Sequence, residues 1–332
     1  MPFLGPKLGY FLVEKGMFEV AAILLLLGIS TGAYFYFRSP ALPDESHEYD
    51  SPKEFAGAFR SGFCGIAVPG SDENTQIHYL QVGDGEDVLL LHGIGASVFS
   101  WRKVIEDLSE YYKVTAIDLL GFGESGKPKD FIYDLDGHAD TVAQFMQAQG
   151  IDKVTLVGSS MGATIGAKVA IDHPQLVRKL VLLAPASDPK RVPHWLKLPS
   201  FHKFGSSLNK FLTPWLMQQI LKKVVSDHKQ INRAMIESYM KPYKANDSAT
   251  PGFFLSFNTL MDRRLPGLFA DLTQPTLVVY GTKDPQVSEK SVDHLSDIIT
   301  TAKVVKIADC GHHVMEDKPR QTATLIRDFH QK

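Results

Sequence analysis

Gly158-Ser159-Ser160-Met161-Gly162 gives the clearest indication of the fold of this chain. It completes the pattern G-x-S-x-G directly after the apolar run 154–157 and directly before a segment with a helical pattern. A serine on such a strand-to-helix turn projects its hydroxyl above the sheet edge, and the flanking glycines remove Cβ atoms that would clash there. Ser160 is therefore a candidate nucleophile. Because simple Gly/Ser turns also end many strands, the assignment depends on the rest of the chain.

A serine hydroxyl is a poor nucleophile at neutral pH, so a working site also needs a base and a group that orients the base. His312 follows the strand-like run 304–307 and is the candidate base, with the neighbouring His313 as the alternative. Asp284 follows the apolar run 276–280 and is the candidate orienting acid. Asp188, which follows an earlier strand-like run, is the alternative acid.

The site also needs N–H donors for an oxyanion. The apolar run 88–91 ends in the turn His92-Gly93-Ile94-Gly95, which is where the second oxyanion donor of such a site lies. The backbone N–H groups of Ile94 and Met161 are the proposed pair. His92 itself is expected to be structural or exposed, and Asp118 is expected to brace its loop through backbone hydrogen bonds.

These residues, in the chain order Ser, Asp, His, resemble the α/β-hydrolase superfamily, specifically its monoacylglycerol-lipase-like and esterase-like members with an inserted cap. The resemblance runs from about Cys64 to Phe329. The stretch 118–125 resembles the family pattern D-x-x-G-x-G-x-S, and the stretch 310–319 resembles G-H-x(4,5)-E-x-P. Alternating strand and helix patterns independently indicate an α/β fold, a mainly parallel sheet covered by helices.

The alternation stops between about 188 and 271, where the sequence reads as helical pieces broken by Pro193, Pro199, Pro214, Pro242, Pro251 and Pro266. We expect this segment to form a helical cap over Ser160. Two of the three tryptophans and several phenylalanines fall in it, and most of them are expected to form the core of the cap. Together they indicate a lipophilic pocket.

The resemblance implies a serine hydrolase that cleaves lipophilic acyl esters or monoacylglycerols. Ser160 attacks the carbonyl while His312 takes its proton, Asp284 orients the imidazole, and water releases the acid from the acyl-enzyme. Hydrolysis of carbon–carbon bonds in diketo acids and cofactor-free perhydrolysis are alternatives within the fold. The dehalogenase and epoxide-hydrolase branches use an aspartate nucleophile, so Ser160 argues against them. A non-catalytic binding module remains a further alternative.

The composition points to no other class of protein. A formal charge of −2 over 332 residues gives no basic footprint for nucleic acid. No phosphate-binding G-x-x-x-x-G-K-[ST] motif is present, and no His, Cys and Asp cluster has the spacing of metal ligands. Two cysteines do not make a disulfide framework. We therefore expect no cofactor and no metal.

The amino terminus carries an uncharged run over 20–37 that ends in an aromatic cluster. Such a length can cross a bilayer, and we expect residues 17–37 to span it, within a membrane anchor at 1–38. Small residues at 30–33 leave a cleaved signal peptide, and hence secretion, as the alternative. A slight excess of lysines before the run favours a catalytic domain on the extracytoplasmic side. A linker at 39–60 and the hydrolase domain at 61–332 complete the expected organisation.

Overall fold

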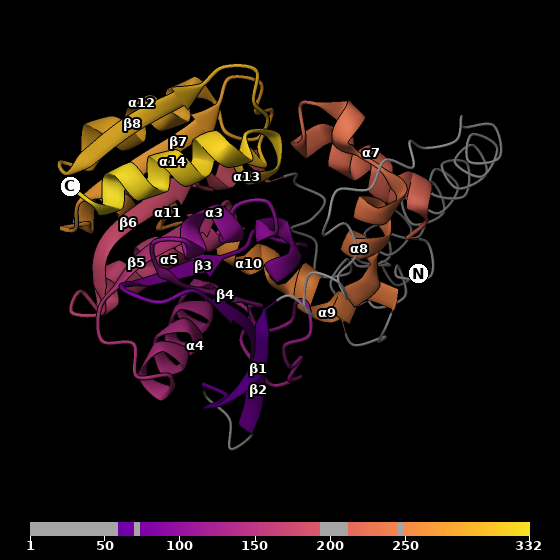
Figure 1. Ribbon diagram of the computed structural model, residues 1–332, viewed down its shortest axis with the longest axis horizontal. Coiled ribbons are helices and arrows are strands. Elements are labelled where there is room, and N and C mark those ends of the chain that lie inside the picture. Colours follow the sequence, from indigo (N-terminus) through magenta and orange to yellow (C-terminus); the bar gives the residue numbers. More distant parts are fainter. Residues whose placement is uncertain (1–58, 70–73, 193–211, 245–248) are drawn as a thin grey trace, which may run out of the picture.

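The structure is a computed structural model that describes residues 59–69, 74–192, 212–244 and 249–332. Its centre is an eight-stranded sheet with the strand order β1-β2-β4-β3-β5-β6-β7-β8 (Figure 1). The strands are β1 (Arg60–Ala67), β2 (Asn74–Val82), β3 (Asp87–Leu91), β4 (Lys113–Ile117), β5 (Val154–Ser159), β6 (Val177–Leu183), β7 (Thr276–Gly281) and β8 (Ala302–Ile307).

The sheet is mainly parallel, as expected. The pairs β1–β2 and β2–β4 are antiparallel, and every other neighbouring pair is parallel. Every residue of β5 and β7 is buried, which is what strands covered by helices on both faces require. Parallel strands end at the same sheet edge, so the turns after β3, β5, β7 and β8 lie along one edge. Those turns carry all the expected site residues.

Helices connect the strands and cover the sheet. Between β3 and β6 they are the 3-10 helix η1 (Val98–Trp101), α3 (Ile105–Ser109), α4 (Leu135–Ala148) and α5 (Met161–Asp172). Near the carboxyl end they are α12 (Glu289–Ile298), α13 (Val314–Asp317) and α14 (Pro319–His330). Helix α4 contacts α5, and α3 contacts α14. The result is the helix-covered sheet of an α/β protein.

The segment between β6 and β7 contains only helices among its described residues. These are η2 (Pro189–Arg191), α7 (Pro214–Val224), η5 (His228–Gln230), α8 (Arg233–Lys244), α9 (Ala249–Leu255), α10 (Phe257–Leu260), α11 (Leu265–Leu268) and η6 (Phe269–Asp271). Helices α7, α8 and α9, here called the cap helices, lie together beside the sheet (Figure 1). This arrangement agrees with the expected insertion of a helical cap.

Two prolines of the cap behave differently. Pro214 begins α7, where its missing N–H costs nothing, and Thr213 caps the same end by accepting the N–H of Leu216 at 3.2 Å. Pro242 was expected to break a helix but lies inside α8. It stands close to the carboxyl end of that helix, so few residues beyond it depend on regular helical hydrogen bonding. Pro193, Pro199 and the other cap residues of 193–211 and 245–248 lie outside the described parts of the chain.

The segment 97–110 forms two short helices, η1 and α3, and not one continuous helix. All four residues of η1 are buried. A regular helix at the surface buries only a stripe of its residues, so a tight 3-10 turn suits this fully buried stretch better. The side chain of Ser97 accepts the N–H of Phe99 and begins the turn.

The expected location as a single-pass membrane protein is corrected. Within 59–69, 74–192, 212–244 and 249–332, the structure has no helix that is both long and apolar enough to cross a lipid bilayer. The proposed span 17–37 and the alternative cleavage site at 30–33 lie outside these ranges. The orientation with an extracytoplasmic catalytic domain depended on that span and is withdrawn with it.

Candidate active site

Ser160 occupies a sharp turn between β5 and α5. Its φ angle is 52°, in the left-handed region that non-glycine residues rarely adopt. Its N–H donates to the carbonyl of Leu183 at 2.9 Å, and its own carbonyl accepts the N–H of Ala163 at 3.1 Å. A backbone held in this region costs about 1–3 kcal/mol, and such strain concentrates at functional sites. The strand–turn–helix context that the sequence predicted for the serine is present.

The glycines on both sides of Ser160 are needed for close packing. A Cβ at Gly158 would lie 2.3 Å from the carbonyl oxygen of Gly162. A Cβ at Gly162 would lie 2.4 Å from the carbonyl oxygens of Leu91 and His92. Both distances are far below van der Waals contact. Gly162 therefore lets α5 approach the end of β3, where the expected oxyanion loop begins.

The structure brings His312 and Asp284 together. Nδ1 of His312 lies 2.7 Å from Oδ2 of Asp284, with 4% and 0% of the two side chains exposed. The other carboxylate oxygen accepts the N–H groups of Gln286 at 2.7 Å and Val287 at 3.0 Å. A carboxylate bound at Nδ1 keeps the proton there and leaves Nε2 as a proton acceptor. This pair therefore has the arrangement that a general base and its orienting acid require.

The two alternative residues have other partners. Asp188 caps η2 by accepting the N–H of Lys190 at 2.9 Å. The ring of His313 stacks on that of Tyr239 with centroids 6.2 Å apart, and burial, aided by the neighbouring His312, lowers the pKa of His313 to about 4. Its Nδ1 is buried without a hydrogen-bond partner in the described part of the chain. These contacts place His313 in packing against the cap.

The helix that follows His312 contacts the end of β5, next to Ser160. The hydroxyl of Ser159 points to the sulfur of Met315 in α13 at 4.0 Å. On the other side, a Cβ at Gly93 would lie 3.2 Å from Cβ of Ser160, so the loop after β3 packs directly on the nucleophile turn. Met161 is the first residue of α5, where an N–H has no acceptor within the helix. The donors proposed for the oxyanion, Ile94 and Met161, thus belong to two segments that adjoin Ser160.

His92 fixes the direction of one of these donors. Its Nε2 accepts the N–H of Leu119 at 3.0 Å, so the ring proton is on Nδ1, which donates to the carbonyl of Gly93 at 2.7 Å. Burial lowers the pKa of His92, which keeps the ring neutral. In a trans peptide the C=O of one residue and the N–H of the next point in opposite directions. Holding the Gly93 carbonyl therefore also orients the N–H of Ile94.

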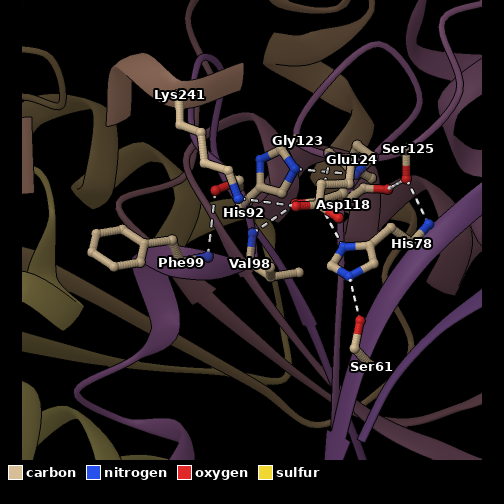
Figure 2. Close-up of polar contacts among 12 residues, drawn as sticks. Ser61, His78, His92, Val98, Phe99, Asp118, Gly123, Glu124, Ser125 and Lys241 are labelled. Carbon is tan, nitrogen blue, oxygen red and sulfur yellow. Dashed lines mark hydrogen bonds and ion pairs between the residues drawn. The ribbon is translucent and has the colours of Figure 1, made fainter. Parts of the chain in front are cut away.

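Asp118 holds the far end of the same loop (Figure 2). Its Oδ1 accepts the N–H of Val98 at 2.7 Å, and its Oδ2 accepts the N–H of Glu124 at 2.9 Å. Asp118 thus braces its loop through backbone hydrogen bonds, as the sequence suggested, and braces the oxyanion loop as well. Glu124 also pairs with Lys241 of α8 at 3.2 Å, which links this region to a cap helix.

A second row of serine, histidine and aspartate lies at the sheet edge (Figure 2). Oγ of Ser61 is 3.0 Å from Nε2 of His78, and Nδ1 of His78 is 2.8 Å from Oδ2 of Asp118. Ser61 lies within the regular strand β1 and has no strand-to-helix turn around it. Because Asp118 also binds two backbone N–H groups, we assign this row a structural role that joins β1 and β2 to the loop after β4.

Aromatic side chains of the cap cover the oxyanion loop. A Cβ at Gly95 would lie 3.0 Å from the ring of Phe253 and 3.2 Å from the hydroxyl of Tyr243. Phe253 in turn packs edge-on against Phe254 and Phe257, with centroids 5.0 and 5.3 Å apart. Burial raises the pKa of the Tyr243 hydroxyl, which keeps it uncharged. The oxyanion loop is therefore covered by aromatic side chains on its cap side.

Two acidic residues near His312 were not assigned a role from the sequence. Asp317 and Glu316 follow the base in the stretch that resembles the family pattern, and both are buried. Their spacing is typical of the family but does not reveal their partners. Apart from Gly311, those partners lie 77 to 214 residues away in the chain. Within the described residues, no group of three or more His, Cys, Asp or Glu side chains is placed to hold a metal ion.

Comparison with known proteins agrees with this geometry. A family model described as alpha/beta hydrolase fold matches residues 88–319. The chain is 33% identical over 264 residues to the 2-hydroxy-6-oxo-6-(2'-aminophenyl)hexa-2,4-dienoic acid hydrolase of Metapseudomonas resinovorans, covering 76% of this chain and 87% of that protein.

Two solved structures are similar over most of their length. A serine hydrolase involved in carbazole degradation has 28% identity and a TM-score of 0.67, covering 82% of this chain and 99% of that one. A membrane phospholipase A, described as a bacterial virulence factor, has 25% identity and a TM-score of 0.68, covering 97% of each chain. These likenesses support the superfamily without confirming the monoacylglycerol-lipase-like subtype. The chain belongs to the α/β-hydrolase family.

Proposed function

We propose that this hydrolase acts through a covalent acyl-enzyme on Ser160. His312 takes the proton of the Ser160 hydroxyl as its oxygen attacks a substrate carbonyl, and Asp284 stabilises the imidazolium that forms. The N–H groups of Ile94 and Met161 receive the oxyanion. The proton then passes to the leaving group, and water attacks the acyl-enzyme in the reverse sequence to release the acid and restore Ser160. The observation that carries this proposal is the 2.7 Å contact between His312 and Asp284, together with the strained backbone of Ser160 on its strand-to-helix turn.

For the substrate we propose a lipophilic carboxylic ester. The aromatic surface formed by Phe253 and Tyr243 over the oxyanion loop supports an apolar acyl chain, because an uncharged chain gains by leaving water there. The likeness to a phospholipase, whose name denotes ester cleavage, supports the same class.

Hydrolysis of a carbon–carbon bond is the second candidate, and the names of the curated relatives support it more strongly than they support ester cleavage. A 2-hydroxymuconate semialdehyde hydrolase of Pseudomonas is also among them. The same acyl-enzyme serves this reaction, with a carbon atom in place of an oxygen atom as the leaving group and proton acceptor. The two candidates therefore differ in substrate and not in nucleophile.

One comparison separates the candidates. Wild-type protein and Ser160→Ala are assayed on p-nitrophenyl esters of increasing chain length, on monoacylglycerols and on 2-hydroxy-6-oxo-dienoic acids. We expect kcat/KM for a medium-chain ester to exceed that for any dienoic acid by at least about a hundredfold, since ester leaving groups depart without protonation at carbon. A preference for the dienoic acid would replace the first candidate by the second. Turnover that persists in Ser160→Ala would refute both.

A further inference from the structure

We infer that Asp317 is a positioning residue for His312, and that it acts by tying the loop of the base to the cap. The inference rests on the proposed role of His312 and extends it to a residue that does not touch the reacting atoms. Asp317 ends α13 and is 7% exposed.

The carboxylate of Asp317 accepts backbone N–H groups from two distant segments. Its Oδ2 lies 2.6 Å from the amide nitrogen of Gly311, the residue directly before His312. The amide of Ser226 lies 3.0 and 2.9 Å from the two carboxylate oxygens, and that of Asp227 lies 3.2 Å from Oδ1. Ser226 and Asp227 follow the end of cap helix α7. One buried carboxylate therefore joins the base loop to the cap.

A second hydrogen bond connects the base loop to the cap, on the other side of His312. The N–H of His313 donates to the carbonyl of Val224, the last residue of α7, at 2.8 Å. The backbone approaches so closely here that a Cβ at Gly311 would lie 2.8 Å from the Val224 carbonyl and 3.0 Å from Oδ2 of Asp317. The residues before and after His312 are thus both held by the turn that follows α7.

These hydrogen bonds fix the position of the imidazole of His312. Asp284 fixes the ring at Nδ1, but the position of the ring also depends on the backbone that carries it. Hydrogen bonds to an ionised acceptor are shorter and stronger than neutral ones, so the Gly311 contact is a firm constraint. A displacement of about 1 Å at a catalytic group can reduce the rate on the order of a hundredfold. Loss of the hydrogen bond to Gly311 is therefore expected to lower the rate of catalysis.

The neighbouring Glu316 extends the same connection. Its Oε1 accepts hydrogen bonds from Arg102 at 2.5 Å and from the hydroxyl of Tyr239 in α8 at 3.0 Å. Burial alone would raise the pKa of Glu316, but the positive charges of Arg102 and Lys103 outweigh it and hold the pKa at about 2. Helix α8 contacts α7. The base loop and two cap helices thus form one connected unit, in which a shift of the cap displaces the base.

The test compares Asp317→Ala and Asp317→Asn with Asp134→Ala in the full chain. Asp134 is the matched control, since its carboxylate also accepts a backbone N–H, that of Gly137 at 2.8 Å, at the start of α4. For each variant we measure the Tm, kcat and KM on a p-nitrophenyl ester, and the rate at which a fluorophosphonate labels Ser160. Labelling reports whether His312 can still take the serine proton, independently of substrate fit.

We expect Asp317→Ala to lower kcat and the labelling rate together by about tenfold to a hundredfold, with KM within about threefold. Asp317→Asn keeps one acceptor oxygen and is expected to lose less. Asp134→Ala is expected to lower the Tm and leave kcat unchanged. If Asp317→Ala does not fold, Asp317→Asn decides by the same criterion.

Unchanged kcat and labelling in the Asp317 variants, with a Tm lowered as in the control, would make Asp317 a structural tie only and overturn the inference. This outcome differs from failure of the proposed function. In that case the wild-type protein itself would neither hydrolyse the esters nor be labelled at Ser160.

Discussion

Replacing His92 by leucine tests whether the oxyanion loop is oriented as the structure indicates. The change removes the bond from Nδ1 to the Gly93 carbonyl and leaves that carbonyl with the weaker N–H of Ala96 at 3.2 Å. It also leaves the N–H of Leu119 without its acceptor. A buried group that loses its partner costs about 1–3 kcal/mol of stability. The variant should therefore be less stable than the wild type and still folded.

The effect on catalysis has an upper limit. Deleting one oxyanion donor outright costs on the order of 10² to 10³ in kcat. His92→Leu keeps the Ile94 N–H but no longer fixes the direction in which it points. We therefore expect kcat to fall by about ten- to a hundredfold. KM should change little, because this donor acts mainly on the charge that develops in the transition state. His92→Asn, which can place an N–H near the position of Nδ1, should recover part of the loss.

The assay is steady-state hydrolysis of a p-nitrophenyl ester, with the Tm of each variant recorded. His138→Leu is the matched control, since His138 is also fully buried and neutral and its Nε2 contacts the hydroxyl of Ser256 at 3.1 Å. We expect the control to lose stability and keep its kcat. If His92→Leu keeps kcat within about twofold of the wild type while losing as much stability as the control, the proposed orientation of Ile94 is wrong.

Three further outcomes follow from the site. Ser160→Ala should abolish hydrolysis while Ser159→Ala keeps most of it, and equal losses in folded proteins would argue against the nucleophile assignment. Asp284→Asn should lower kcat by roughly 10⁴ through the wrong imidazole tautomer; a larger loss in Asp188→Asn would move the orienting acid. Burial lowers the pKa of His313 to about 4. Between about pH 6.5 and pH 4, His313 is therefore protonated in the unfolded chain and neutral in the folded chain. Stability should fall by about 3 kcal/mol across that window, and urea titrations should show a flatter pH profile for His313→Asn.

The sequence predicted those parts of the fold that depend on local patterns. Apolar runs of strand length gave the parallel strands, and the glycines around Ser160 indicated a close strand–helix contact that Gly158 and Gly162 in fact make. The division of 97–110 into η1 and α3 could not be predicted, because periodicity does not separate a 3-10 helix from an α-helix in so short a segment.

Long-range contacts explain most of what the sequence could not show. His92 was expected to be structural or exposed, and only the fold shows that its ring joins Leu119 to Gly93. Asp317 meets Ser226 across 91 residues of chain, and no spacing rule predicts such a partner. The membrane location was inferred from apolar character and length alone, and the described helices do not support it.

Labelling with a fluorophosphonate tests whether Ser160 is the activated nucleophile. The full-length protein and Ser160→Ala are treated with the probe, and the modified residue is identified by peptide mass spectrometry. We expect rapid, stoichiometric labelling of Ser160 in the wild type, strong slowing in His312→Ala, and no rapid labelling in Ser160→Ala. Rapid labelling of Ser61, whose row with His78 and Asp118 has the same order of hydrogen bonds, or an unlabelled wild-type protein, would contradict it.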